Sequence, residues 1–333
     1  MEAEAGLDIA PGVAKQGFRA AGVSAGLRVT DTEHGVILHF ARGDVTISPG
    51  ERGTKLTIAA GDAAGLQLIR DTIAERVAGM GLTLDWATSV AGTQPGNMSI
   101  ANVTSVKRLS PAYMRLILEG DDLARFADGP LHFRLLFGPE GTNWPTLNAD
   151  GVTVWPGGAE AWHRPVYTTR EIETRPDGSG RITFDVFMHE GGRTTAWAQS
   201  VAVGEQIAMT GPGGGNGAKR AGTVALFGDE TAVPVIARIL AELPVDARGQ
   251  ATMLVPSRED IQNLTAPDGI EIKWILRDWE SSLLTSLKTA PFPNADRFVF
   301  FASERSEVFA ARDWLNLQGW DRTEFLCASY WTA

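Results

Sequence analysis

A short segment of the chain combines an aromatic ring, hydroxyl groups and two guanidinium groups, and it reads Arg-Pro-Val-Tyr-Thr-Thr-Arg over residues 164–170. Its β-branched residues favour an extended strand, in which Tyr167 and Thr169 share one face while Thr168 and Arg170 share the other. A tyrosine can lie flat on a conjugated ring, and a threonine hydroxyl can hydrogen-bond to a ring nitrogen. Since arginine binds phosphate with a fork of donors, the segment is suited to a flat redox ring and its pyrophosphate.

A second segment with binding chemistry follows about twenty residues later. An alternating strand ends at His189, and a Gly-Gly pair then turns the chain into a helix that opens with Thr194 and Thr195. A hydroxyl residue that opens a helix after glycines leaves backbone N–H groups suited to an anion. From these residues alone, an ordinary β-hairpin followed by a capped helix is an equally good interpretation.

A third segment has the form of a strand, a tight turn and a helix. An apolar strand ends at Gly228, and Asp229, Glu230 and Thr231 open a helix with Pro234 in its first turn. Parallel α/β sheets present a ligand crevice at such strand ends. The G-x-G-x-x-G fingerprint is absent, so the pattern alone is typical of any α/β domain.

In this order, the motifs resemble those of the siderophore-interacting proteins, which are FAD-dependent ferric-siderophore reductases in the ferredoxin-reductase superfamily. The resemblance covers residues 96–333, and its motifs are residues 164–170, 189–198, 211–214, 228–240, 274–278 and 328–331. Its most specific parts are residues 228–232 with Pro234 and the closing residues 329–331. Residues 1–95 more loosely resemble a domain of unknown function, DUF2218.

The resemblance implies a role for each residue of the flavin segments. Tyr167 would flank the flavin ring, and Thr168 would hydrogen-bond near its reactive nitrogen. Arg170 and backbone groups near His189 would hold the ribityl and pyrophosphate part. The implied FAD-binding residues are Arg164, Tyr167, Thr168, Thr169, Arg170, His189, Gly192, Thr194 and Thr195. The family has arginine two positions before the tyrosine, where this chain has Pro165; either a bulge brings Arg164 into place or Arg170 takes the larger share.

The resemblance also implies a site for the nicotinamide nucleotide. Its residues would be Gly228, Asp229, Glu230, Thr231, Ser257, Arg258 and Tyr330. A serine beside an arginine suits a 2′-phosphate, which favours NADPH over NADH as the electron donor. Trp331, counted as catalytic together with Tyr167 and Thr168, would cover the other face of the flavin with Tyr330, although a hydrophobic terminus docked on the sheet is the alternative.

The implied reaction passes electrons from NADPH or NADH through FAD to the iron of a ferric siderophore. Hard oxygen ligands hold Fe(III) better than Fe(II), so reduction loosens the metal. No protein ligand to a metal is expected, and Arg134, Lys273 and Arg277 are candidate contacts for the chelate. Two alternatives stay open: a non-catalytic protein that binds ferric chelate on the same fold, and a flavin reductase whose acceptor is a protein or a quinone.

Composition sets limits on the partners and the location. A net charge of −10 argues against nucleic acid and anionic membranes as partners. The first residues lack the basic and apolar regions of a signal peptide, and no apolar run approaches ~20 residues. We therefore expect a cytoplasmic protein without membrane insertion. The single cysteine, Cys327, excludes an internal disulfide.

The chain divides into three predicted domains. We expect a small α+β domain over residues 1–95, an antiparallel β-barrel that binds FAD over 96–218, and a doubly wound parallel α/β domain that binds NAD(P)H over 219–333. The expected strands are 35–41, 45–48, 55–59, 82–86, 100–107, 113–119, 132–137, 166–172, 182–188, 224–227, 251–255, 271–276, 298–302 and 324–328. The expected helices are 63–78, 233–243, 283–287 and 304–317. Residues 138–160 are expected to form a long loop near the site, and residues 211–215 a hinge.

Overall fold

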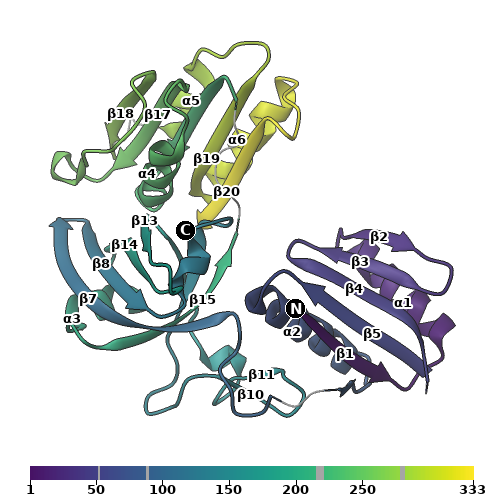
Figure 1. Cartoon of the computed structure of the whole chain (residues 1–333). Helices are drawn as coiled ribbons and strands as arrows, with labels where there is room; N and C mark the ends of the chain where they lie inside the picture. Colours follow the sequence, from purple (N-terminus) through teal and green to yellow (C-terminus); the bar gives the residue numbers. More distant parts are fainter. Residues whose placement is uncertain (52, 88–89, 215–220, 278–281) are drawn as a thin grey trace. The chain divides into compact units, whose positions relative to one another are not determined.

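The computed structural model of the protein describes residues 1–51, 53–87, 90–214, 221–277 and 282–333 (Figure 1). These residues form two compact units. One comprises residues 1–99, 135–164 and 208–211, and the other comprises residues 100–134, 165–207 and 212–333. The predicted boundary between residues 218 and 219, like the end of the expected hinge at residue 215, lies outside the described residues.

Most of the first unit is an antiparallel sheet with two helices on one face. The sheet has six strands in the order β2-β3-β4-β5-β1-β6. The elements are β1 (Glu2–Leu7), α1 (Pro11–Ser24), β2 (Arg28–Asp31), β3 (Val36–Phe40), β4 (Gly43–Gly50), β5 (Gly53–Ala60), α2 (Ala63–Gly79) and β6 (Asp85–Trp86). Alternate strand residues are buried, and they share a core with Phe18 of α1 and Ile69 of α2. The α+β prediction is confirmed, although β1, α1 and β2 were not predicted.

Residues 138–160, expected to be a loop, contain regular structure. A ribbon of β10 (Thr146–Leu147) and β11 (Thr153–Val154) is followed by a short 3₁₀ helix, η2 (Ala159–Ala161). Helix α2 holds this ribbon, because the carboxylate of Asp71 accepts hydrogen bonds from the Thr153 amide (2.9 Å) and hydroxyl (2.7 Å). Gln67 adds a bond from Nε2 to the Gly151 carbonyl at 3.0 Å.

Seven strands form the sheet of the barrel-like region, in the order β12-β9-β15-β7-β8-β14-β13. The elements are β7 (Met98–Ser110), β8 (Tyr113–Gly120), η1 (Leu123–Phe126), β9 (His132–Leu136), β12 (Val166–Thr168), β13 (Glu171–Thr174), β14 (Gly180–Phe187), α3 (Arg193–Ser200) and β15 (Gln206–Gly213). The predicted antiparallel strands are confirmed. Strand β15 was not predicted, and it takes up residues 211–213 of the expected hinge.

The sheet closes where the strand predicted over residues 166–172 is interrupted. Strands β12 and β13 stand at opposite ends of the strand order, yet only Thr169 and Arg170 separate them in the chain. The Thr169 amide donates to the Leu131 carbonyl before β9 (2.8 Å), whereas the Arg170 amide donates to Thr183 of β14 (2.9 Å). The chain changes neighbours here, so one continuous strand was a wrong prediction. We call residues 166–171 the seam segment.

The C-terminal part is a parallel α/β sheet in the order β18-β17-β16-β19-β20. Its elements are β16 (Thr223–Gly228), α4 (Val233–Glu242), β17 (Arg248–Val255), η3 (Arg258–Asp260), β18 (Ile270–Leu276), α5 (Leu283–Thr289), β19 (Arg297–Glu304), α6 (Arg305–Leu317) and β20 (Phe325–Trp331). This confirms the doubly wound prediction. The chain order reverses between β16 and β19, and the C-terminal ends of these two strands form the switch point at which such sheets bind ligands.

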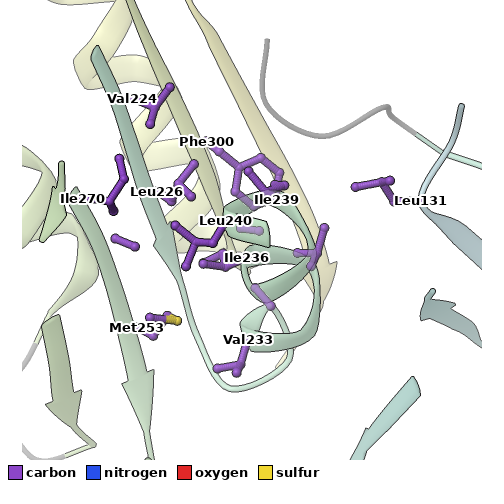
Figure 2. Packing of buried hydrophobic residues seen from close by; sticks show 14 of the residues in the cluster. Leu131, Val224, Leu226, Val233, Ile236, Ile239, Leu240, Met253, Ile270 and Phe300 are labelled. Carbon is purple, nitrogen blue, oxygen red and sulfur yellow. The ribbon is translucent and has the colours of Figure 1, made fainter. Parts of the chain in front are cut away.

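Side chains of β16 alternate between two hydrophobic cores. Val224 and Leu226 pack with helix α4, as Figure 2 shows from close by. Ala225 and Phe227 pack with α5 and α6 on the opposite face. Because both faces of the strand are covered, nearly every residue of β16 is buried, and the strand is an uninterrupted apolar run in the sequence.

Candidate functional site

Tyr167 is held by an aromatic cluster at the start of the seam segment. Its ring packs against Phe133 and Phe184, with ring centroids 6.4 and 5.6 Å away. Burial raises the pKa of the Tyr167 phenol, and a hydrogen bond with the Thr194 side chain acts against that rise. The ring is half-buried, so one part of it is fixed by packing while another part stays accessible.

The residues before and in α3 come together beside this cluster. Helix α3 starts after Gly192, and the His189 amide donates to the Thr195 hydroxyl at 3.3 Å. A Cβ atom at position 192 would lie only 2.6 Å from the His189 ring, so glycine lets that ring lie close to the start of the helix. The first amide that bonds four residues back within the helix is that of Ala196. The amides before it have no such helical partner, which fits an anionic group.

The three residues after Tyr167 are buried. Thr168 is 5% exposed and pairs with His132 across the β12–β9 ladder. The hydroxyl of Thr169 is buried without a hydrogen-bond partner among the described residues. The expectation that Thr169 shares a face with Tyr167 was wrong, because strand alternation ends at Thr168.

Arg170 lies inside the barrel-like region. Its side chain is 6% exposed, and Nη1 lies 3.2 Å from Oδ2 of Asp185. Arg115 also binds Asp185, with Nε 2.7 Å from Oδ1 and Nη2 2.9 Å from Oδ2. Burial lowers the pKa of the Arg170 guanidinium, while Asp185 acts in the opposite direction. The role of Arg170 as a phosphate contact stays a prediction, since this conformation directs its charge to Asp185.

Arg164 belongs to the first unit, where it meets a cluster of indoles. Its guanidinium lies over the ring of Trp155, 4.8 Å from the centroid. Trp162 packs against both Trp155 and Trp144, with centroids 5.5 and 6.2 Å apart. The cation–π contact accounts for the position of Arg164 without reference to a phosphate.

Asp229 is the centre of the switch point. It is fully buried directly after β16, and its Oδ1 accepts hydrogen bonds from the Thr231 amide (2.9 Å) and hydroxyl (2.5 Å). Its Oδ2 accepts from Nε1 of Trp331 at 2.7 Å and lies 3.2 Å from the hydroxyl of Ser303. Helix α4 has Ala232 as its N-cap and no side-chain cap. Asp229 therefore organises the turn before the helix and fixes the indole of Trp331.

A hydrogen bond connects β9, the neighbour of β12, with the end of β20 at this switch point. Nε2 of His132 lies 2.9 Å from the hydroxyl of Tyr330, and the two rings meet edge to face. Burial lowers the pKa of the His132 imidazole. Because His132 pairs with Thr168 and Tyr330 precedes Trp331, a short path of contacts runs from Thr168 to Asp229.

The remaining predicted residues of the nucleotide site have structural partners. A Cβ atom on Gly228 would lie 2.6 Å from Ile236, so glycine lets the helix pack closely on the strand. Glu230 pairs with Arg277, with its Oε1 2.8 Å from Nε, and the Glu230 carbonyl accepts from the Tyr113 hydroxyl. Arg277, a candidate chelate contact, is thereby committed to Glu230.

Ser257 and Arg258 differ in their surroundings. Ser257 donates to Oδ2 of Asp260 at 2.8 Å, and Oδ1 of Asp260 accepts from the Ser110 hydroxyl (2.6 Å) and the Ala112 amide (2.8 Å). Arg258 is exposed. Ser257 thus helps to join the barrel-like region to the parallel sheet, while Arg258 is the residue of this pair that is open to an anion. The two other candidate chelate contacts, Arg134 and Lys273, lie on exposed parts of β9 and β18.

Several residues of the site were missed by sequence reasoning. Asp185 is a carboxylate at a buried strand position, which is a detectable anomaly because such a group needs a cationic partner. Ser303 and the partner role of His132 depend on contacts between distant segments and left no local signal. Among the residues described, no group of three or more His, Cys, Asp and Glu side chains could hold a metal ion. None of the described helices is both long and apolar enough to cross a membrane.

An antiparallel barrel-like region followed by a doubly wound parallel sheet defines a protein of the ferredoxin-reductase class. Residues 102–216 match the siderophore-interacting FAD-binding domain, and residues 221–333 match the model described as siderophore-interacting protein. The chain therefore belongs to the siderophore-interacting protein family.

Individual relatives agree with this assignment. Ferric vibriobactin reductase ViuB of Vibrio cholerae is 29% identical over 221 residues, which cover 62% of this chain and 78% of ViuB. The NADPH-dependent ferric-chelate reductase of Escherichia coli is 27% identical over 239 residues, 69% of this chain and 91% of the relative. The crystal structure of a siderophore utilization protein from T. fusca, 28% identical, superposes with a TM-score of 0.62 and covers 71% of this chain and 92% of its own.

Proposed function

We propose that this protein is an NAD(P)H-dependent, FAD-containing reductase of ferric siderophores. The observation that carries the proposal is the path of contacts from Thr168 through His132 and Tyr330 to Trp331 and Asp229. It supports the proposal because it links residues proposed for the flavin with residues proposed for the nucleotide, on a chain of the siderophore-interacting family. When bound, FAD would supply the chemistry that accepts a hydride from the nucleotide and delivers single electrons to Fe(III).

The residues of the first half of the site suit a flavin. The Tyr167 ring, fixed by Phe133 and Phe184, offers a flat surface beside the seam segment. Thr168, the next residue along β12, supplies a hydroxyl, and the first turn of α3 supplies amide donors for the pyrophosphate. We propose that Arg170 acts here chiefly by holding Asp185 and the seam segment.

The second half of the site suits the nicotinamide nucleotide. We propose that the dinucleotide lies across the C-terminal ends of β16 and β19, where Asp229, Thr231 and Trp331 meet. Trp331 is 39% exposed, and its indole Nε1 donates a hydrogen bond to Asp229, the residue that also organises the turn before α4. Exposed Arg258 is the group that would distinguish the 2′-phosphate of NADPH from the free hydroxyl of NADH.

The substrate that we propose is a ferric siderophore, in agreement with the names of the two reductases above. The chelate keeps its own oxygen ligands, so the protein needs to supply electrons and a surface but no ligand to iron. We further propose that the protein works in the cytoplasm, that residues 1–95, 96–218 and 219–333 are its domains, and that the first of these is DUF2218-like.

Anaerobic reduction tests this function. Protein loaded with FAD is mixed with NADPH, and a ferric hydroxamate or catecholate is then added together with a ferrous-specific chelator. We expect NADPH to bleach the flavin absorbance and the chelate to restore it while ferrous complex accumulates. A colourless protein that still binds ferric siderophore would instead support a carrier. Bleaching without ferrous product, but with turnover on a ferredoxin or a quinone, would replace the acceptor.

A matched pair of variants adds a control to this experiment. Thr168→Val removes the hydroxyl beside Tyr167 and keeps the side-chain volume, whereas Thr174→Val makes the same change at an exposed position of β13. Losing one hydrogen bond to the reacting ring predicts an about tenfold slower reduction for Thr168→Val. Thr174→Val is expected to retain the wild-type rate.

A further inference from the structure

Arg238 is a buried cation in the helix that follows the nucleotide-binding turn. It lies in α4 and is 5% exposed. Its Nε is paired with Glu242 one turn later, while Nη1 donates to the Thr169 carbonyl at 3.0 Å and Nη2 to the Ala127 carbonyl at 3.2 Å. All three nitrogens are therefore bound, two of them to backbone of the barrel-like region.

The Thr169 carbonyl is a demanding partner, because it belongs to the peptide at which the sheet changes neighbours. The amide of the same peptide, that of Arg170, donates to Thr183 of β14, and the amide of Thr169 donates to Leu131. With Arg238 on the carbonyl, each of these polar backbone groups is bonded. Removing the guanidinium would leave a buried carbonyl without a partner, which typically costs more than the bond itself contributes.

Apolar packing reinforces the same connection. Leu131, which precedes β9, belongs to one core cluster with Ile236 and Ile239 of α4, and Figure 2 shows it reaching toward the helix from a separate segment. Helix α4 thus contacts two neighbouring points of the barrel-like region: Leu131, directly before β9, and Thr169, directly after β12. A lysine would keep the charge but has no planar fork to bind two carbonyls at once.

We propose that Arg238 is a positioning residue for the flavin site, which fixes the seam segment so that Tyr167 and Thr168 present the ring and the hydroxyl to FAD. The inference rests on the proposed function, because it explains how helix α4 of the parallel sheet would orient the seam segment that we propose binds FAD. Arg238 touches neither cofactor. It acts through the Thr169 peptide, one residue beyond Thr168.

The test compares three variants in FAD titrations of the full-length apoprotein, followed by visible absorbance. Arg238→Met removes both bonds to the barrel-like region and keeps the side-chain length. Arg238→Lys keeps the charge and can reach one carbonyl only. Glu242→Ala is the matched control, because it removes the solvent-side partner, 49% exposed, and leaves Thr169 untouched.

We expect Arg238→Met to bind FAD at least about tenfold more weakly, and Arg238→Lys about threefold to tenfold more weakly, from the loss of one or two charged hydrogen bonds. Glu242→Ala should bind FAD within about twofold of the wild type, since Glu242 is itself exposed and both bonds from Arg238 to the barrel-like region stay in place. With saturating FAD, the two Arg238 variants should also show a shifted flavin absorbance band and slower reduction by NADPH. If Arg238→Met does not fold, the Arg238→Lys titration carries the test alone.

Three results would overturn the inference. Arg238 variants that lower the melting temperature of the apoprotein, yet bind FAD and are reduced as the wild type is, would show a purely structural role. Wild-type protein that does not bind FAD at all would refute the proposed function, and the inference with it. If the wild-type protein binds FAD and Arg238→Lys binds it with the same affinity, the proposed function stands and only the positioning role is removed.

Discussion

The seam segment and the end of β20 hold their aromatic side chains in two different ways. Tyr167 is packed against two phenylalanine rings and is bonded to Thr194. Trp331 is 39% exposed, and Nε1 reaches the carboxylate of Asp229 at the edge of the sheet. One ring is held by packing against other rings, and the other is held by a hydrogen bond at a single polar atom. Under the proposed function, the first ring would give the flavin a fixed surface, and the second would be a movable cover that a bound nucleotide displaces from Asp229.

Among variants of the two rings, Tyr167→Ala is expected to have the largest effect on stability and on FAD binding. Removing a ring packed against two others should cost about 3 kcal/mol of unfolding free energy and abolish tight FAD binding. Urea unfolding of the apoprotein and an FAD titration measure these two quantities. Tyr167→Phe is the matched control, which loses only the bond with Thr194, worth about 1 kcal/mol. Unchanged FAD affinity in Tyr167→Ala would remove Tyr167 from the site.

Trp331→Phe examines the movable cover. The substitution keeps an aromatic ring and removes the N–H that binds Asp229, so a nucleotide no longer has to break that bond. A hydrogen bond to a carboxylate of about 1.4 kcal/mol corresponds to an about tenfold lower Kd for NADP⁺. Isothermal titration calorimetry checks this value, and urea unfolding should change by less than about 1 kcal/mol. Weaker nucleotide binding would instead mean that the indole is a binding surface.

These expectations depend on contacts that sequence patterns reveal only in part. Each strand of the parallel sheet was predicted to within a few residues, because buried β16 and β19 are continuous apolar runs with clear ends. The break at Thr169 was not predictable, since two threonines favour strand whichever neighbour they bond. The motif residues Tyr167 and Asp229 stood out by type, whereas His132, Ser303 and Arg238 became meaningful only through partners far away in the sequence.

Stability should depend on pH through His132 of β9, whose imidazole is hydrogen-bonded to Tyr330 of β20. Burial lowers the pKa of its imidazole in the folded state, so below the unfolded value of about 6.5 the unfolded chain binds more protons. The free energy of unfolding should therefore fall as the pH drops below about 6.5, by up to about 1 kcal/mol from this residue. Urea unfolding at pH 5.5 and 7.5 measures the fall. His132→Gln, which retains a partner for Tyr330, should reduce it, and an identical slope in the variant would contradict this origin.

A further prediction concerns Cys327, the buried cysteine of β20. Burial raises the pKa of the Cys327 thiol to about 11, so the thiol stays protonated at pH 8. A rise of two units from 9 lowers the thiolate fraction about 100-fold, and a disulfide reagent should react at least that much more slowly with native protein than with protein in urea. A rapid native reaction would show that β20 opens along its length, and the contrast between its inner part and Trp331 would be lost.

The most direct measurement is the stoichiometry of FAD in the folded wild-type protein, followed by visible absorbance as FAD is added to apoprotein. We predict one FAD per chain and a resolved flavin spectrum that differs from that of free FAD. FMN at equal concentration should displace none of the bound FAD. Folded protein whose spectrum is only the sum of apoprotein and free FAD would contradict the central claim that the seam segment is a flavin site.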